Sequence, residues 1–166
     1  MAKFKFEGVD EYVSKLVSLS KVSEGVIKRA VYEGAGVVGD AILDAIRALP
    51  ETGAGYPKRG YFPTQMVRGV TAEQKQGLLD GFGYAKMEND NGYINTKIGF
   101  DGYNATKTEK YPNGQPNALI ARSIESGTSK HQKTPFVRPA ISKAKAKAEA
   151  AMAASVDKDI NNTMEG

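Results

Sequence analysis

Apolar residues recur at helical spacing along two stretches of the first fifty positions. Val9, Tyr12, Val13, Leu16 and Val17 predict a helix over about residues 10–19. A second helix is expected to begin at a serine cap and to end near Leu49, because Pro50 cannot continue it. Its apolar period is carried by Val26, Ile27, Ala30, Val31, Val37, Val38, Ala41, Ile42, Ala45 and Leu49, and its candidate caps are Ser20 and Ser23.

Three glycines, Gly34, Gly36 and Gly39, lie inside this second helix. Each costs about 1 kcal/mol relative to alanine in a helix interior. The sequence leaves two explanations open. Either another backbone approaches this surface closely, or a well-packed helix simply tolerates the glycines.

The middle of the chain changes to a period of two, which is typical of strands. Residues 83–88 and 93–100 predict a hairpin around the turn Asn89–Gly92, because Asn-Gly readily adopts positive φ. One face of the return strand is apolar, so helices should cover it. This face carries Ile94, Thr96, Ile98 and Phe100. A weak helix capped by Thr71 is expected over 71–79, and Phe4 and Phe6 alternate with lysines as in a short edge strand.

The last third of the chain is organised around a corner. A short apolar segment after Pro116 leads to 125–129, and a polar, basic link then reaches Thr134–Pro139. Proline suits the first turn of a helix and no later position, so Pro135 and Pro139 predict where the C-terminal helix begins. This helix is expected over Phe136–Ile160, with residues 161–166 frayed. Its predicted apolar stripe is Val137, Ile141, Ala144, Ala148, Met152, Val156 and Ile160.

These patterns together predict an α+β fold in a single domain, residues 1–166. A small antiparallel sheet should pack against a long N-terminal helix and a C-terminal helix. Long irregular loops are expected at 51–71 and 101–115, where glycine, proline and polar residues break the periodicity.

Composition narrows the functional classes. The chain has 166 residues and no cysteine, which excludes a disulfide framework, a thiol nucleophile and a cysteine-ligated metal. Neither a membrane span nor the apolar core of a signal peptide stands out, so we expect synthesis in the cytoplasm and no membrane partner. His131 is the only histidine, and no carboxylates cluster at ligand spacing. We therefore expect no catalytic residues, no metal and no cofactor.

Positive charge is concentrated in the second half of the chain. Residues 101–150 hold nine Lys/Arg and four Asp/Glu, whereas residues 1–100 hold thirteen and twelve. Lys143, Lys145 and Lys147 are candidates to face DNA, or they form only the solvated side of the helix. Aromatic and basic side chains also interleave in the loop at Tyr56, Lys58, Arg59 and Tyr61. This pattern suits nucleic acid, and the alternative is a mobile loop that becomes ordered on a protein partner.

Glu125 and Arg138 are the two charges that the corner could bring together. One interpretation is a partly buried, bidentate ion pair. The other is two unrelated surface charges.

The corner also resembles a known family. Glu125-Ser126-Gly127-Thr128-Ser129, followed by Thr134-Pro135-Phe136-Val137-Arg138-Pro139-Ala140, is similar to the hallmark of a tailed-bacteriophage family of minor tail or head–tail joining (neck) proteins. Their role is similar to that of the lambda tail-completion protein. The residues that carry the resemblance are Glu125, Gly127, Thr128, Pro135, Phe136, Arg138 and Pro139. The long stretch from Gly53 to Val70 departs from the family's pattern, since many relatives have a shorter link with a "DTG-L" signature there. Glu51-Thr52-Gly53 keeps only the Thr-Gly of that signature, with Glu ahead of it.

This resemblance implies a non-catalytic structural protein of the virion, assembled in the host bacterial cytoplasm. Its implied partners are other copies of itself in a ring, the phage connector or stopper and tail terminator proteins, and packaged DNA by non-specific contact. The alternative left open by the residues is a nucleic-acid-binding module that uses the basic C-terminal helix and the aromatic and basic loop.

Overall fold

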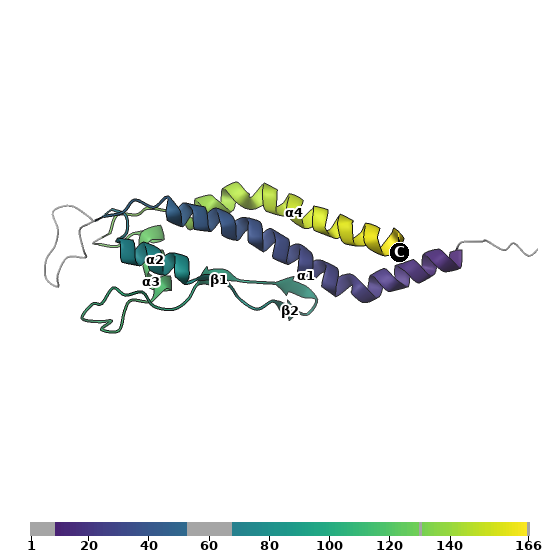
Figure 1. The fold of residues 1–166 in the computed structure, drawn as a ribbon, viewed down its shortest axis with the longest axis horizontal. Coiled ribbons are helices and arrows are strands. Elements are labelled where there is room, and N and C mark those ends of the chain that lie inside the picture. Colours follow the sequence, from purple (N-terminus) through teal and green to yellow (C-terminus); the bar gives the residue numbers. More distant parts are fainter. Residues whose placement is uncertain (1–8, 53–67, 130, 166) are drawn as a thin grey trace, which may run out of the picture.

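The computed structural model describes residues 9–52, 68–129 and 131–165. In this part of the chain four helices and two small antiparallel ribbons confirm the expected α+β fold (Figure 1). The elements in chain order are α1 (Val9–Arg47), α2 (Ala72–Asp80), β1 (Phe82–Tyr84), β2 (Glu88–Asp90), β3 (Tyr93–Asn95), β4 (Ile98–Phe100), α3 (Asn117–Ser126) and α4 (Val137–Glu165).

The first fifty residues form one long helix, so the prediction of two separate helices was wrong. α1 has 39 residues, which corresponds to about 58 Å at 1.5 Å per residue. Neither glycine nor proline occurs between residues 9 and 24, so nothing breaks the backbone hydrogen bonds at Ser20 or Ser23. The predicted end is confirmed to within two residues, because α1 stops at Arg47, just before Pro50.

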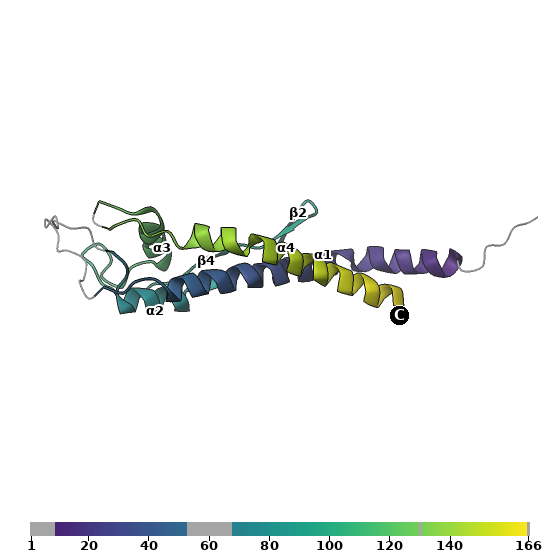
Figure 2. The same ribbon diagram turned by 90° about the horizontal axis from the view of Figure 1, so that it is seen from above.

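α4 runs antiparallel to α1 and crosses it at a shallow angle (Figure 2). The two helices approach closely at Gly34, where an added Cβ would lie 2.6 Å from Cγ of Met152 and 3.6 Å from the carbonyl oxygen of Ala148. Further along, Nε of Arg29 lies 2.7 Å from Oδ2 of Asp159. Glycine at position 34 thus allows close approach of α4, one of the two explanations that the sequence left open.

Gly36 and Gly39, the other two glycines that the sequence analysis considered, differ from one another. A Cβ at Gly39 would collide with the side chain of Tyr84 in β1, so this glycine admits the hairpin. A Cβ at Gly36 would meet nothing within 4 Å, so close approach does not explain it.

The predicted apolar stripe of α4 is confirmed at every position except Ile141, because its other six residues are buried or partly buried. Its buried positions are spaced by four residues, from Phe136 through Ala140 and Ala144 to Ala148. Ile141, placed in the apolar stripe by the sequence, is 43% exposed. The reason is that the large Phe136 ring enters the core and sets the phase, whereas the small alanines that follow let the helices pack closely.

The end of α4 also differs from the prediction. The helix continues to Glu165 and is not frayed from residue 161. The hydroxyl of Thr163 donates to the carbonyl oxygen of Asp159 at 2.8 Å, and the ion pair of Asp159 with Arg29 joins this end to α1.

The hairpin is present but interrupted. β1 pairs with β4 and β2 pairs with β3, which leaves two short ribbons where two continuous strands were expected. The register changes by one residue between the two ribbons. At this break the hydroxyl of Thr96 donates to the carbonyl oxygen of Ala85 at 2.8 Å. The turn is confirmed, although only Asn91 and Gly92 form it, with φ of 53° and 92°.

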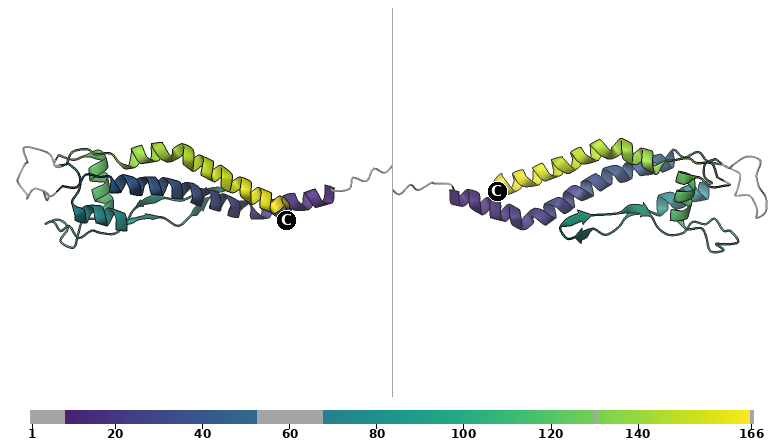
Figure 3. Two further views of the ribbon diagram at one scale, coloured as in Figure 1. Left: turned by 45° about the horizontal axis from the view of Figure 1, so that its top comes forward. Right: turned by 180° about the vertical axis from the view of Figure 1, so that it is seen from behind.

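The hairpin lies on the side of α1 opposite α4, as Figure 3 shows from two directions. Ile94 is buried, and Ile98 and Phe100 are partly buried against the core, which confirms the covered face. The Phe100 ring lies 6.1 Å from that of Phe136. At the tip, hydrogen bonds from Lys28 and then Asn89 lower the pKa of Glu24.

α2 and the 101–115 segment close one end of the molecule. The predicted Thr71 cap is confirmed as a capping box, in which Thr71 and Gln74 each bind the other's backbone N–H. The 101–115 segment is tied down by backbone bonds, including that from Asn104 N–H to the carbonyl oxygen of Gln115 at 3.0 Å. The side chain of Asn117 donates to the carbonyl oxygen of Asp101 at 2.8 Å.

Most of the predicted 51–71 loop lies outside the described residues, as do Phe4 and Phe6. The two flanks of the loop meet in a parallel bridge between Glu51 and Val70. The backbone N–H of Thr52 donates to the carbonyl oxygen of Val70 at 2.8 Å, and that of Val70 donates to the carbonyl oxygen of Pro50 at 2.9 Å.

Two residues of α3, one buried and one exposed, provide a matched test of the hydrophobic core. Ile124 is fully buried in it, whereas Leu119 in the same helix is 41% exposed. We expect Ile124→Ala to lower the free energy of unfolding by about 2–5 kcal/mol, because it leaves a cavity. Leu119→Ala should lower it by less than about 1 kcal/mol. Urea unfolding measures both, and equal losses would contradict the described packing.

Candidate functional site: the corner between α3 and α4

Gly127 ends α3 and starts the corner. Its φ of +76° lies in the left-handed region, and its N–H donates to the carbonyl oxygen of Ser123 at 2.9 Å. A Cβ at this position would lie 3.0 Å from the backbone nitrogen of Lys133. Both the backbone conformation and the returning chain therefore require glycine at this position.

The link then turns back on itself. The backbone N–H of Thr128 donates to the carbonyl oxygen of His131 at 2.9 Å, and the hydroxyl of Thr128 accepts from the N–H of His131 at 3.0 Å. The N–H of Thr134 donates to the carbonyl oxygen of Ile124 at 2.8 Å, which returns the chain to α3. Pro135 follows directly and precedes the first turn of α4.

Glu125 holds the start of α4 from the neighbouring helix. Its Oε2 accepts from the backbone N–H groups of Phe136 at 2.7 Å and Val137 at 2.9 Å. Its Oε1 accepts from the N–H of Arg138 at 3.2 Å. The next residue, Pro139, has no N–H, and the first bond within the helix runs from Ala140 to Phe136. Every backbone donor at the start of α4 is thus either bound by this carboxylate or removed by proline.

The bidentate ion pair between Glu125 and Arg138 is not observed. A single contact of 3.7 Å joins Nε of Arg138 to Oε1 of Glu125, and the Arg138 side chain is 76% exposed. The prediction was wrong in its geometry because the backbone N–H groups of α4 already occupy the carboxylate. The spacing of charged residues along the sequence gives no information about hydrogen bonds from backbone N–H groups to a side chain. The sequence therefore did not predict this contact.

The pKa of Glu125 reflects competing effects. Burial raises it, but the three backbone N–H donors and the nearby Arg138 guanidinium together hold the pKa below its usual value. The folded protein therefore favours the ionised carboxylate. The positive end of the α4 dipole acts in the same direction.

His131 is a second tie at this corner, and sequence reasoning missed it. Its side chain is 1% exposed. Nε2 lies 2.5 Å from the carbonyl oxygen of Gly69. Because a carbonyl oxygen can only accept, Nε2 is the donor of this hydrogen bond. Gly69 has φ of +88° and packs against Pro50. His131 thus fastens the α3–α4 link to the segment that follows the 53–67 stretch, and no signal in its polar sequence context indicated burial.

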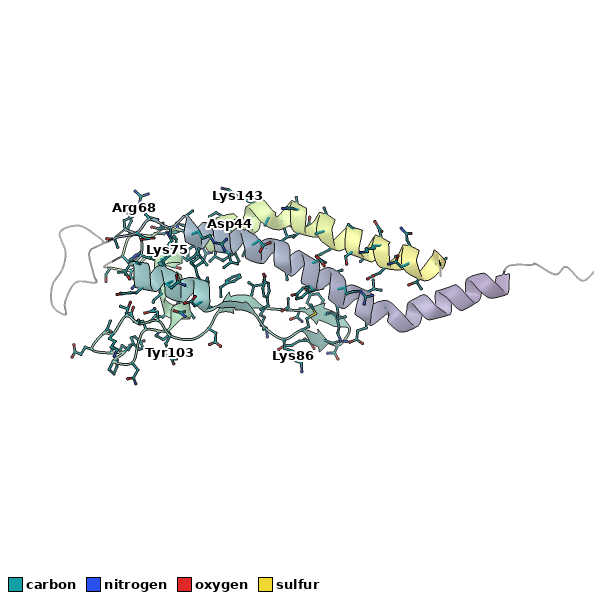
Figure 4. The ribbon with its side chains drawn as sticks, viewed as in Figure 1. Asp44, Arg68, Lys75, Lys86, Tyr103 and Lys143 are labelled. Atoms are coloured by element: carbon teal, nitrogen blue, oxygen red, sulfur yellow. The ribbon has the colours of Figure 1, made fainter. Side chains whose placement is uncertain are left out.

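The three lysines proposed to face DNA do not share one face. Lys143 and Lys147 lie one turn apart on the outside of α4, while Lys145 lies about 200° around the helix from Lys143. Lys145 is 3.8 Å from Glu149. Figure 4 shows Lys143 on the outer side of the helix pair. The other nucleic-acid candidates, Tyr56, Lys58, Arg59 and Tyr61, lie outside the described residues.

The described residues offer neither a membrane-spanning helix nor a cluster of metal ligands. None of the helices there combines the length and the apolar composition that a membrane crossing needs. No group of three or more metal-ligating side chains occurs among residues 9–52, 68–129 and 131–165.

Glu125 can be tested against Arg138. We expect Glu125→Ala to lower the free energy of unfolding by about 2–4 kcal/mol, because it leaves three backbone donors at a partly buried helix start without their charged acceptor. Arg138→Ala is the matched control and should cost less than about 1 kcal/mol, since its contact is long and exposed. Chemical denaturation of both variants measures this, and a costlier Arg138→Ala would contradict the described cap.

The lowered pKa of Glu125 gives a second prediction. The stabilisation should be complete above the carboxyl group's ordinary pKa of 4.5 and should be lost as the pH falls through the lower folded value. Glu125→Gln does not titrate at this position. The stability difference between the native chain and Glu125→Gln should therefore be largest near neutral pH and should shrink in acid. A difference that stays constant from pH 7 to pH 3 would contradict the lowered pKa.

Comparison of the chain with protein-family models, with curated proteins and with solved structures finds no match.

Proposed function

We propose that this chain is a non-catalytic structural protein of a tailed-phage virion, which joins or completes the tail at the head–tail interface. The proposal rests on one observation: the residues that carry the family resemblance have structural roles in this protein. Glu125 binds the start of α4, Gly127 adopts the required positive φ, and Phe136 fills the core. Residues engaged in this way serve architecture, which is what a passive building block requires.

The elongated shape supports the same proposal. α1 and α4 form a long antiparallel pair, and the thin hairpin extends along α1 (Figure 1). Such a subunit exposes long faces relative to its small core, and neighbouring copies in a ring could cover them. The ring would meet the connector or stopper on one side and the tail terminator on the other, in a virion that is assembled in the host cytoplasm.

The competing function is a nucleic-acid-binding module. Lys143 and Lys147 could track phosphates along one side of α4, but Lys145 points elsewhere and is near Glu149. Two lysines on one face are consistent with the weak, non-specific contact that passing DNA needs. For this reason we place the neck component first.

An antibody against the purified chain tests the proposal on phage particles from the strain that encodes it. We expect gold label at the junction of head and tail in electron micrographs, with no label on tail fibres. Particles that carry no label anywhere, combined with a strongly salt-dependent shift of DNA by the free protein, would favour the nucleic-acid module instead.

A further inference from the structure

Asparagine is followed by glycine at two places in the chain, Asn91-Gly92 and Asn113-Gly114. Asparagine is one of the thermolabile residues of proteins. A following glycine has no Cβ, so its backbone nitrogen can approach the side-chain amide of the asparagine without steric hindrance. Both pairs lie at turns, but their surroundings differ.

Asn91-Gly92 lies at the tip of the hairpin, where residues 88–93 are all exposed apart from their strand pairing. The backbone N–H of Gly92 donates to Oδ1 of Asn89 at 2.8 Å. The side chain of Asn89 also hydrogen-bonds the carboxylate of Glu24 in α1. One exposed amide therefore holds the nitrogen of Gly92 and joins the hairpin tip to α1.

Asn113-Gly114 lies in a more restrained segment. The Asn113 side chain is exposed, but Gly114 is buried. The N–H of Gly114 donates to the carbonyl oxygen of Tyr111 at 3.2 Å, and a Cβ at Gly114 would collide with the carbonyl oxygen of Asn104. Movement of the Gly114 nitrogen therefore requires the opening of packed backbone, which costs more than the opening of an exposed turn.

We propose that Asn91 is a site of spontaneous deamidation and that Asn89 controls its rate. Hydroxide removes the proton of the Gly92 amide, and the nitrogen attacks Cγ of Asn91. The bond from Cγ to Nδ2 breaks, and ammonia leaves after taking a proton from water, which closes a succinimide ring. Water then opens the ring at either carbonyl carbon, so position 91 becomes aspartate or isoaspartate. The net reaction consumes one water and releases one ammonia.

Asn89 controls this reaction because it binds the group that must react. The hydrogen bond from Gly92 to Asn89 stabilises the protonated amide, whereas the attack needs the deprotonated nitrogen. The same bond helps to hold the turn at its φ of 53° and 92°. Reaction therefore requires a local opening of the turn in which this bond is broken.

Both products change the tip of the hairpin. Each adds a negative charge next to Asp90, and isoaspartate also lengthens the backbone of a two-residue turn by one carbon. The pairing of Asp90 with Tyr93 depends on the length of that turn, so isoaspartate should weaken it. The site is independent of the proposed function, because its reactants are the chain itself and water.

The two Asn-Gly pairs are compared in one experiment on the full chain. The folded protein is incubated at mildly alkaline pH, and peptide mapping by mass spectrometry follows conversion at each asparagine. We expect Asn91 to react at least about tenfold faster than Asn113. In guanidinium chloride the two rates should become similar, because the unfolded chain protects neither site. Equal rates in the folded protein, or the same difference in the unfolded chain, would overturn the proposal.

Asn89→Ala tests the role of Asn89. It removes the acceptor of the Gly92 N–H, so conversion at Asn91 should become about three- to tenfold faster, which is the effect of one hydrogen bond. Conversion at Asn113 in the same sample should not change. Asn95→Ala is the matched control, since Asn95 lies in the same hairpin and its side chain donates to the carbonyl oxygen of Tyr93. An Asn91 rate unchanged by Asn89→Ala, or raised equally by Asn95→Ala, would contradict this control by Asn89.

Discussion

A carboxylate from one helix holds the start of another, and the rest of the molecule depends on it. Glu125 in α3 accepts from three consecutive backbone N–H groups of α4, and Pro139 removes the next donor. A capping group usually comes from the residue next to the helix it caps. Here it comes from a separate helix, so the cap fixes the position and the direction of α4 as well as its first residue.

The direction of α4 determines how the molecule is built. Phe136 follows the cap immediately and enters the core, where it meets Phe100 of the hairpin. From there α4 returns along α1, with small residues where the two helices approach and with the Arg29–Asp159 ion pair near its far end. A local hydrogen-bonding arrangement thereby sets the course of a helix of 29 residues.

The opposite side of α1 carries the thinner part of the fold. Gly39 admits the Tyr84 side chain, and the hairpin then extends along α1 as two short ribbons. Gly83 and Gly99 lie opposite each other at the centre of the first ribbon. The molecule therefore combines a firmly held corner with a thin two-stranded ribbon on the other side of α1.

Several features followed from the sequence alone, because their causes are local. Pro50 ends α1, Thr71 caps α2, and Asn91-Gly92 forms the hairpin turn, since each effect depends only on neighbouring residues. The alternation at Ile94, Ile98 and Phe100 indicated the covered face for the same reason. The two prolines likewise indicated where α4 begins.

Other features were decided only by tertiary structure. The partner of Glu125 proved to be a backbone, whereas the sequence suggested Arg138, because charge spacing carries no information about backbone donors. The phase of α4 follows from the burial of Phe136, so Ile141 faces solvent despite its hydrophobic side chain. His131 is buried against the segment that contains Gly69, which is 62 residues away in the chain. Local patterns determine where elements start and stop, whereas the contacts between distant elements determine which side chains those elements bury.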